Sequence, residues 1–289
     1  MPYRLFRGHE SRSTSVSPLS NPTIDPVEVD ARRIRLLTFN IQVGIHTRRF
    51  HQYVTKGWKH LLPHEDRVTN LDRIAEVCRA YDVVALQEVD GGSLRSGFVD
   101  QVAYLATRGD FPYWYTQRNR DLGPIAQHGN GLLTRLPPRE LQDHKLPGVI
   151  PGRGAIVARL PFAGSHGDPT NDLLVILLHL SLGSKSRHRQ LSYVRELIEG
   201  HRHVIVMGDM NSHLSKLMSR SPLADADLRP AEEIQPTYPS WRPAVAIDHV
   251  LVSSSLSIAD YEVLPHLISD HLPMAVTVEP VNESPVRPQ

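Results

Sequence analysis

The chain has 289 residues, 40% hydrophobic and 22% charged, so it is long enough to bury a large core in one or two domains. Its 32 lysines and arginines almost balance 31 aspartates and glutamates, which argues against a broad electrostatic surface for nucleic acid and leaves only a local basic groove open. The single cysteine, Cys78, excludes an internal disulfide framework and a cysteine-rich zinc site. Because Cys78 falls on the apolar side of a helical pattern, we expect a buried structural thiol.

Residues 1–30 are expected to form a flexible leader that lies against the fold without forming its core, because they are rich in Ser, Pro, Thr and Asn and show no period. No long apolar run follows the N-terminus, so we expect neither a secretory signal nor a membrane span, and a cytoplasmic location by default. Residues 31–280 show no repeat and no break in composition. We therefore expect one domain there and a C-terminal tail over 281–289.

The remaining chain alternates between strand-like and helix-like segments, which predicts an α/β fold. Helical spacing of apolar residues predicts helices over 65–81 and 186–199, and a further helix is expected over 97–109. Short apolar runs typical of buried strands occur at 34–39, 82–86, 113–116, 132–134, 155–160, 173–178, 204–207, 246–252 and 274–278. The segment 44–64 mixes cations with aromatic residues, which is typical of a phosphate, base or lipid-headgroup contact and equally of a solvated insertion.

The stretch 204–211 combines a buried strand with polar residues at its end. Its apolar, β-branched run predicts a strand, and we expect Gly208 to permit a tight turn that presents Asp209 and Asn211 at the C-terminal end. In α/β proteins that edge usually carries the chemistry. A carboxylate and an amide two residues apart can hold a water, a metal ion or a phosphoryl oxygen. The alternative is an ordinary Asp-x-Asn turn.

Several other predicted strands end in the same way. The polar residues at or near those ends are Asn40, Glu88, Asn130, His179, Asp248, Asp270 and His271. Each of them alone has an ordinary structural explanation, such as a turn or a solvated strand end. Together they form an oxygen-rich, sulfur-free set that suits Mg²⁺ or Mn²⁺ better than Zn²⁺ or copper. Carboxylates about 4 Å apart would repel by roughly 4 kcal/mol at an effective dielectric of 20, and a cation would remove that penalty.

The order of these short motifs resembles that of the endonuclease/exonuclease/phosphatase superfamily over residues 34–279. The motifs are Thr38-Phe39-Asn40, Leu86-Gln87-Glu88-Val89, His128-Gly129-Asn130-Gly131, His179-Leu180, Gly208-Asp209-Met210-Asn211, Ile247-Asp248-His249-Val250 and Ser269-Asp270-His271-Leu272-Pro273. The resemblance implies a DNase I-like, four-layer α/β sandwich, in which two mixed β-sheets pack face to face with helices outside. It also implies one active site at the sheet edges.

The resemblance implies a phosphoric ester hydrolase that depends on Mg²⁺ or Mn²⁺. Glu88 and Asn40 would bind the metal, with Asp270 joining them, and the ion would act as a Lewis acid on a phosphoryl oxygen. Asp209 would orient or deprotonate the attacking water. Asn211 would hold water and phosphate in line.

The same resemblance assigns the two histidines to the phosphate. His179 and His271 would donate hydrogen bonds to it, and one of them would serve as general acid or base. Asp248 would fix the tautomer of His271 and raise its basicity, while Asn130 would be a further phosphate or water ligand. Whether Asp209 or a histidine is the base is left open at this stage.

Three arginines are further candidates. Arg153 stands between two glycines, where its planar guanidinium can approach a phosphate closely, although a solvated hairpin arginine gives the same pattern. Arg187 and Arg189 lie at the start of a predicted helix after His179, and we expect Arg189 rather than Arg187 to contribute positive charge to the substrate.

The sequence favours a metal-dependent phosphodiesterase acting on a phospholipid headgroup or a small phosphodiester. A DNA or RNA endo- or exonuclease is the alternative, and a catalytically silent binding module on the same fold is the third hypothesis. The intact acidic set argues against the silent module. No protein partner can be inferred.

Overall fold

The computed structural model describes residues 13–25, 29–44, 65–121, 123, 125–148, 152–162, 171–230 and 235–281. The mixed basic and aromatic segment 44–64 therefore lies outside the described residues apart from Gly44, as does residue 282 onward of the expected tail.

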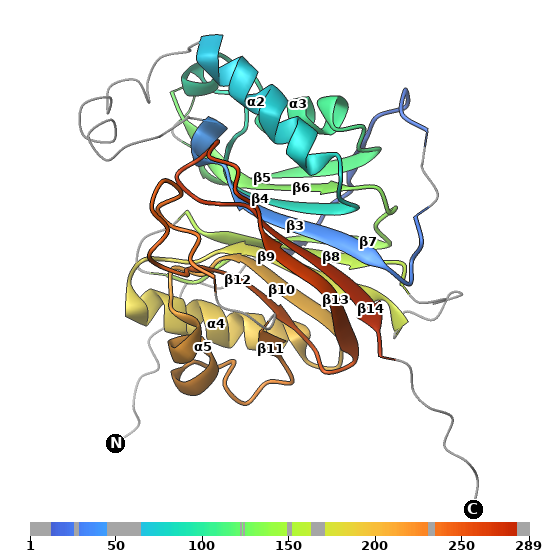
Figure 1. The fold of residues 1–289 in the computed structure, drawn as a ribbon, viewed down its shortest axis with the longest axis vertical. Helices are drawn as coiled ribbons and strands as arrows, with labels where there is room; N and C mark the ends of the chain where they lie inside the picture. The colour runs from blue at the N-terminus through green and yellow to red at the C-terminus, as the bar shows by residue number, and fades with distance from the viewer. Residues whose placement is uncertain are drawn as a thin grey trace, which may run out of the picture.

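Two seven-stranded sheets form the body of the molecule, and Figure 1 shows them packed face to face. The first sheet has the order β1 (Ser13–Ser15), β7 (Glu140–Lys145), β8 (Gly154–Leu160), β9 (Leu173–His179), β10 (His203–Asp209), β12 (Asp248–Val252), β11 (Arg229–Pro230). The second has the order β13 (Leu256–Val263), β14 (Met274–Pro280), β3 (Ile34–Asn40), β4 (Val83–Asp90), β6 (Gln127–Thr134), β5 (Tyr113–Asp121), β2 (Leu19–Ser20). Both sheets are mixed, because β9 and β10 are parallel, as are β3 and β4.

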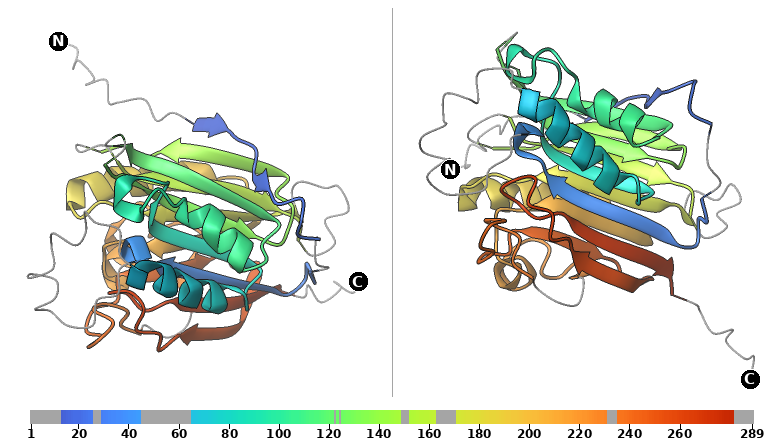
Figure 2. Two further views of the ribbon diagram at one scale, coloured as in Figure 1. Left: turned by 90° about the horizontal axis from the view of Figure 1, so that it is seen from above. Right: turned by 45° about the horizontal axis from the view of Figure 1, so that its top comes forward.

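Helices cover the outer face of each sheet, so the expected four layers are confirmed (Figures 1 and 2). The described α-helices are α2 (Glu65–Cys78), α3 (Gln101–Arg108), α4 (Ser184–Ile198) and α5 (Leu214–Arg220), with short 3₁₀ turns η1 (Gln42–Gly44) and η3 (Leu94–Ser96). One apolar cluster fills the space between the sheets, a second lies under α2 and α3, and a third lies under α4 and α5. None of the helices that the structure describes is long and apolar enough to cross a membrane.

In the α2 helix, the regular spacing of apolar residues places them on the face that packs against the second sheet. Leu71, Ile74, Ala75 and Cys78 recur every three to four residues and are buried against the second sheet. Cys78 is fully buried, and burial raises the pKa of its thiol to about 12. The expectation of a structural thiol is thus confirmed, since so weak an acid forms little thiolate near neutral pH.

Strand directions bring the predicted polar residues to one edge of the sandwich. The parallel pair β3 and β4 ends at Asn40 and just past Glu88, and the parallel pair β9 and β10 ends at His179 and Asp209. The β12 strand is antiparallel to β10, and its first residue, Asp248, is paired with Asp209. Both sheets therefore present their polar strand ends on the same side of the molecule.

Two details differ from the sequence expectations. Part of the expected leader is regular structure, because β1 pairs with β7 and β2 pairs with β5 at the sheet edges. The expected turn at Gly208 is wrong, since β10 continues through this residue to Asp209. Gly208 has a φ of 139°, and a Cβ there would lie 2.0 Å from the carbonyl oxygen of Leu178. Glycine is therefore required because β9 passes too closely for any side chain.

Candidate active site

Asp209 is the centre of the polar cluster at this edge. Its Oδ1 accepts a hydrogen bond from the backbone N–H of Asn211 at 2.9 Å. Its Oδ2 accepts from Asn40 Nδ2 at 3.3 Å and lies 3.4 Å from His179 Nε2. The Asn211 side chain is fixed in turn, because its Nδ2 donates to the carbonyl oxygen of Leu180 at 3.0 Å. Asn40 comes from one sheet and Asp209 from the other, so this cluster bridges the sandwich.

A second group is built on His271 and Asp248. His271 Nδ1 lies 2.8 Å from Asp248 Oδ2, which also accepts a hydrogen bond from the hydroxyl of Thr237. The ring of Tyr238 packs against the imidazole with centroids 4.9 Å apart. Burial alone would favour the neutral imidazole, but Asp248, Asp209 and Asp270 raise the pKa of His271 to about 10. The Nδ1–H of His271 is therefore committed to Asp248, and Nε2 is its remaining donor.

Several carboxylates are crowded together here. Burial, together with the charges of Asp248 and Glu88, raises the pKa of Asp209 to about 7, although His271 and the Asn211 N–H oppose the shift. Burial and the charge of Glu88 likewise raise the pKa of Asp270 to about 6, again against the effect of His271. The edge therefore holds more negative charge than its own histidine and hydrogen bonds neutralise.

His179 has the opposite environment. Burial, together with the positive charges of Arg153, His271 and His128, lowers the pKa of its imidazole well below 6.5. The ring is therefore neutral at physiological pH in the absence of a further anion. Its Nε2 is directed at Asp209.

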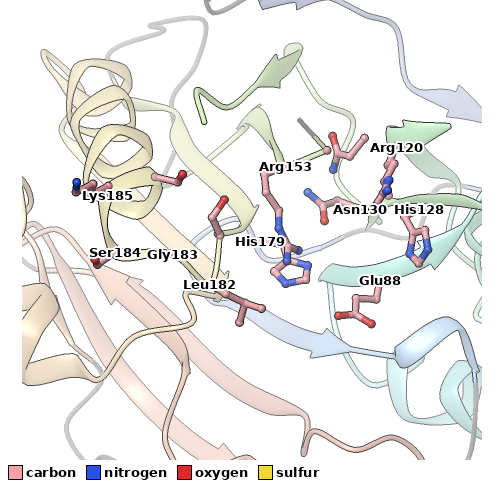
Figure 3. Close-up of a pocket in the computed structure, with 15 residues that line it drawn as sticks. Glu88, Arg120, His128, Asn130, Arg153, His179, Leu182, Gly183, Ser184 and Lys185 are labelled. Carbon is pink, nitrogen blue, oxygen red and sulfur yellow. The ribbon is translucent and has the colours of Figure 1, made fainter. Parts of the chain in front are cut away.

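Glu88 is held in an unusual backbone conformation. It occupies a β-bulge between Gln87 and Val89 where β4 pairs with β6, and its φ is 56°. A positive φ at a non-glycine residue is strained, and bulges often redirect a side chain beside an active site. The Glu88 carboxylate lines a cavity and makes no hydrogen bond or ion pair with any residue in the described part of the chain. Figure 3 shows it at the rim of this cavity below His128.

The cavity has a volume of about 690 Å³ and reaches from Glu88 and His179 to the start of α4. Figure 3 shows Asn130, Arg153 and His179 around it. Its basic side chains are Arg120, His128, Arg153 and Lys185. Within the described ranges, Arg120, Arg153 and Lys185 have no ion-pair partner within 4 Å. Unpaired cations around a cavity are suited to an anionic ligand.

The predicted arginines divide into two groups. Arg153 reaches the cavity, and burial lowers the pKa of its guanidinium while Glu88 and Asp209 raise it. Arg189 lies on the exposed face of α4 and does not line the cavity. Arg187 donates to the carbonyl oxygens of Ser181 and Leu182, so it fixes the loop before α4.

Sequence reasoning missed two basic residues of the cavity. Arg120 is near the end of β5, and Lys185 is in the first turn of α4. Neither stands in a short motif, and each reaches the cavity only because the hairpin of β5 and β6 folds opposite the β9–α4 loop. A basic residue just after the His179 motif was the available signal for Lys185.

A group of ligand atoms close enough to share a metal ion is also present. One atom each from Asp209, Asp248 and His271 lie within 4.8 Å of one another. Asp248 Oδ2 already accepts from His271 Nδ1 and Thr237 Oγ1, so these contacts hold part of the group together without an ion. Glu88 differs, because its carboxylate has no partner in the described residues.

Comparisons with known proteins agree with this architecture. The chain resembles an endonuclease/exonuclease/phosphatase from Beutenbergia cavernae DSM 12333 at 21% identity and a TM-score of 0.64, covering 86% of this chain and 72% of that one. It resembles a mannosyl-6-phosphatase of Bacteroides thetaiotaomicron VPI-5482 at 17% identity and a TM-score of 0.60, covering 85% and 99%. A third similar structure is D. rerio TDP2 complexed with a single-strand DNA product, at 16% identity and a TM-score of 0.61, covering 86% and 99%.

No curated protein matched the sequence. The family model described as "Endonuclease/Exonuclease/phosphatase family" matches residues 37–271, which include every predicted strand end from Asn40 to His271. At these identities the structural neighbours establish the DNase I-like fold alone, whereas the family model spans most of the chain. The chain therefore belongs to the endonuclease/exonuclease/phosphatase family of phosphoric ester hydrolases.

Proposed function

We propose that the protein is a divalent-metal-dependent phosphodiesterase that acts on a small phosphodiester or a lipid headgroup. The observation that carries the proposal is the position of Asp209. It contacts His179 of the neighbouring strand in its own sheet and Asn40 of the other sheet, next to a cavity with unpaired cations. A buried carboxylate, a histidine and an anion-binding wall are the parts that water attack on a phosphoester needs.

We infer that Glu88, Asn40 and Asp270 hold the metal ion. Glu88 makes no hydrogen bond or ion pair in the described chain, and its negative charge raises the pKa of Asp270, so a cation bound by both carboxylates would relieve the repulsion between them. The donors are carboxylate and amide oxygens, which Mg²⁺ and Mn²⁺ prefer. When bound, such an ion would offset negative charge that develops on the phosphoryl group.

Asp209 would orient and deprotonate the attacking water in this mechanism. Its carboxylate is fixed at both oxygens, because Oδ1 accepts from the Asn211 N–H and Oδ2 accepts from Asn40 Nδ2. A carboxylate oxygen has two lone pairs, so Oδ1 would still accept a hydrogen bond from the reacting water. Asn211 would hold the same water and a phosphate oxygen in line. Its amide is anchored on Leu180, and within the described residues its second N–H and its Oδ1 make no hydrogen bond.

The two histidines would bind the phosphate from one side. Asp248 accepts from Nδ1 of His271, which leaves the Nε2–H to donate to a phosphate oxygen. An anionic phosphate would favour the protonated ring of His179, which would then donate from Nε2 to Asp209 and from Nδ1 to a phosphate oxygen. Arg153 would add a guanidinium from the neighbouring wall.

The volume of the cavity supports a small substrate. About 690 Å³ lies within the range of roughly 300–1,000 Å³ that is typical of small-molecule sites. Arg120 and Lys185 would extend the positive wall beyond the scissile phosphate. A nucleic acid would enter this cavity with a single strand, a terminus or a nucleotide extruded from a duplex.

The test is product release from a panel measured with Mg²⁺, with Mn²⁺ and with EDTA. The panel contains a soluble phosphodiester, phospholipid vesicles, a phosphomonoester, plasmid DNA and single-stranded RNA. Asp209→Asn controls for contaminating enzymes. Asp225→Asn is the matched variant, because Asp225 is an exposed carboxylate in the chain before β11.

Metal-dependent cleavage of the soluble diester or the lipid, lost in Asp209→Asn and kept in Asp225→Asn, is the expected result. Cleavage of the monoester alone would make the protein a phosphatase, and cleavage of DNA or RNA alone would make it a nuclease. Activity that EDTA leaves intact would contradict the metal dependence.

A further inference from the structure

Asn130 is buried at the cavity wall, and its side-chain amide is held by the protein on one side. The side chain is 1% exposed and lines the cavity beside Arg153 and His128 (Figure 3). Its Nδ2 donates one hydrogen bond to Gln117 Oε1 at 3.0 Å and a second to the carbonyl oxygen of Gly154 at 3.0 Å. An amide nitrogen has two hydrogens, so both donors of Asn130 are used inside the protein.

The amide of Gln117 has only one satisfactory orientation. Its Nε2 lies near three acceptors, which are Asp143 Oδ1 at 2.7 Å and the carbonyl oxygens of His144 and Ala155 at 3.3 and 3.0 Å. A flipped amide would direct its oxygen at a carboxylate and two carbonyls. Gln117 Oε1 must therefore accept, and Asn119 Nδ2 donates to it as well at 3.1 Å.

The same reasoning fixes Asn130. A flip of its amide would place the Asn130 oxygen against the Gln117 and Gly154 oxygens, and that arrangement would lose two buried hydrogen bonds. The chain of donors thus runs in one direction, from Asn130 through Gln117 to the Asp143 carboxylate. Asn130 Oδ1 is the polar atom left over, and it accepts no hydrogen bond from the described residues.

An acceptor at this position is unsuited to a phosphate oxygen, which is also an acceptor. We propose that Asn130 Oδ1 accepts a hydrogen bond from a hydroxyl group of the substrate, so that the cavity selects hydroxylated phosphoesters of the polyol or sugar type. The inference rests on the proposed function for the phosphoester and adds the chemical class of its organic group. It replaces the expectation that Asn130 is a phosphate or water ligand.

The residues that share the cavity with Asn130 are suited to such a substrate. Asn130 lies in the same cavity as Glu88 and His179, and the unpaired Arg153 stands beside it. A phosphoester bound to the cations and histidines would place its organic group along this wall. A site that is built to receive a hydroxyl discriminates against an analogue without it, because the buried acceptor is then left without a partner.

Binding can be measured without any chemistry by calorimetry on the wild-type protein. The probes are 3,4-dihydroxybutylphosphonate and butylphosphonate, whose carbon–phosphorus bonds resist hydrolysis and which differ only in the hydroxyls. We expect the dihydroxy compound to bind about 10-fold more tightly or better. Equal affinities would overturn the inference, whatever the outcome for catalysis.

Turnover provides the second measurement. The substrates are 2,3-dihydroxypropyl p-nitrophenyl phosphate and propyl p-nitrophenyl phosphate. The wild type should prefer the hydroxylated ester in kcat/KM, and Asn130→Ala should reduce the ratio close to one through a higher KM for that ester. Asn21→Ala is the control, because Asn21 does not line the cavity and its side chain hydrogen-bonds to Thr23, and the ratio should survive in it.

The outcomes separate the two proposals. No turnover of either ester, together with selective phosphonate binding, would remove the proposed phosphodiesterase activity and keep the hydroxyl site. Turnover of both esters with equal kcat/KM would support the phosphodiesterase activity and remove the hydroxyl site. If Asn130→Ala lowered kcat equally for both esters and left a wild-type preference unchanged, Asn130 would serve the reacting water and the inference would be wrong.

Discussion

Both ends of the sandwich carry arginine-lined cavities, but the arginines have ion-pair partners at one end and lack them at the other. At the end opposite the candidate site, a cavity of about 460 Å³ is lined by Val29, Asp30, Arg33, Arg35, Arg79, Asp82 and Arg135. Arg35 binds both oxygens of Asp82, at 3.1 and 2.8 Å, and Arg33 pairs with Glu279. At the candidate site, Arg120, Arg153 and Lys185 have no such partner in the described residues.

Arg135 shows how far the pairing goes at the opposite end. It is 8% exposed and donates to four carbonyl oxygens, those of Arg79, Tyr81, Gly109 and Asp110, just after α2 and α3. Its guanidinium also lies 4.6 Å from the centroid of the Phe111 ring. These contacts join the ends of two helices, which is a structural role.

The difference teaches that composition alone does not identify a functional cavity. Both cavities contain arginines and carboxylates, and only the state of their pairing separates them. Where the chain satisfies its own charges, the residues stabilise the fold. Where like charges crowd and cations stand alone, the missing partners point to a ligand.

The largest expected effect is at Asp209. Asp209→Asn should lower kcat by about 10²–10⁴-fold, because it removes the group that activates water. The thermal transition should hardly change, since the substitution also relieves repulsion from Asp248 and Glu88. Steady-state kinetics and calorimetry on the same preparation measure both. A variant that keeps most of its activity would refute the role of Asp209.

Asp82→Ala, at the opposite end of the sandwich, should lower the stability of the protein and leave its activity unchanged. It removes two hydrogen bonds from the Arg35 side chain and one from the Arg35 backbone N–H, so we expect a loss of about 1–3 kcal/mol in the free energy of unfolding. Activity per folded molecule should be unchanged. A fall in kcat with unaltered stability would contradict the structural role of the Asp82 end.

Glu88→Gln tests the unpaired carboxylate. The concentration of Mg²⁺ or Mn²⁺ that gives half-maximal activity should rise by about 10-fold or more, because even the loss of a residue that only supports a metal ligand typically weakens metal binding by about 10–100-fold. Glu196→Gln, on the exposed surface of α4, is the matched control. An unaltered metal titration in Glu88→Gln would exclude Glu88 from the metal site.

The smallest expected effect is the pH dependence of stability that arises from His144, which lies outside the candidate site. His144 is buried between Tyr193 and Gln142, and burial lowers its pKa below 6.5 while Asp143 opposes the shift. The unfolded chain therefore takes up this proton first, and His144 costs stability as the pH falls below about 6.5, by at most about 1.4 kcal/mol per pH unit. The stability difference between wild type and His144→Gln should shrink from pH 7.5 to 5.5. A difference that is constant across this range would contradict the prediction.

The sequence predicted the buried strands and the polar residues that end them, because both are local signals. The strands β9 and β10 are continuous apolar runs, and Asn40, His179 and Asp209 follow such runs directly. Elements with weak local signals were missed. In β7 only Leu141 and His144 are buried, and β13 is an edge strand interrupted by a bulge.

The cavity could not be predicted, because it depends on contacts between distant segments. Arg120 and Lys185 meet there only through the packing of a hairpin against a helix start. The direction of the Asn130 amide depends on Gln117 and Asp143, which are 13 residues away on either side. No short motif carries that information.

The bond between Asn40 and Asp209 joins residues 169 positions apart and belonging to different sheets. The candidate site is consequently not a property of either sheet, and it exists only while the apolar layer between them keeps the two in alignment. Ile205 and Val276 belong to that layer. Catalysis therefore requires the native packing between the sheets. An expanded state that keeps its strands and helices but loses this packing would be inactive.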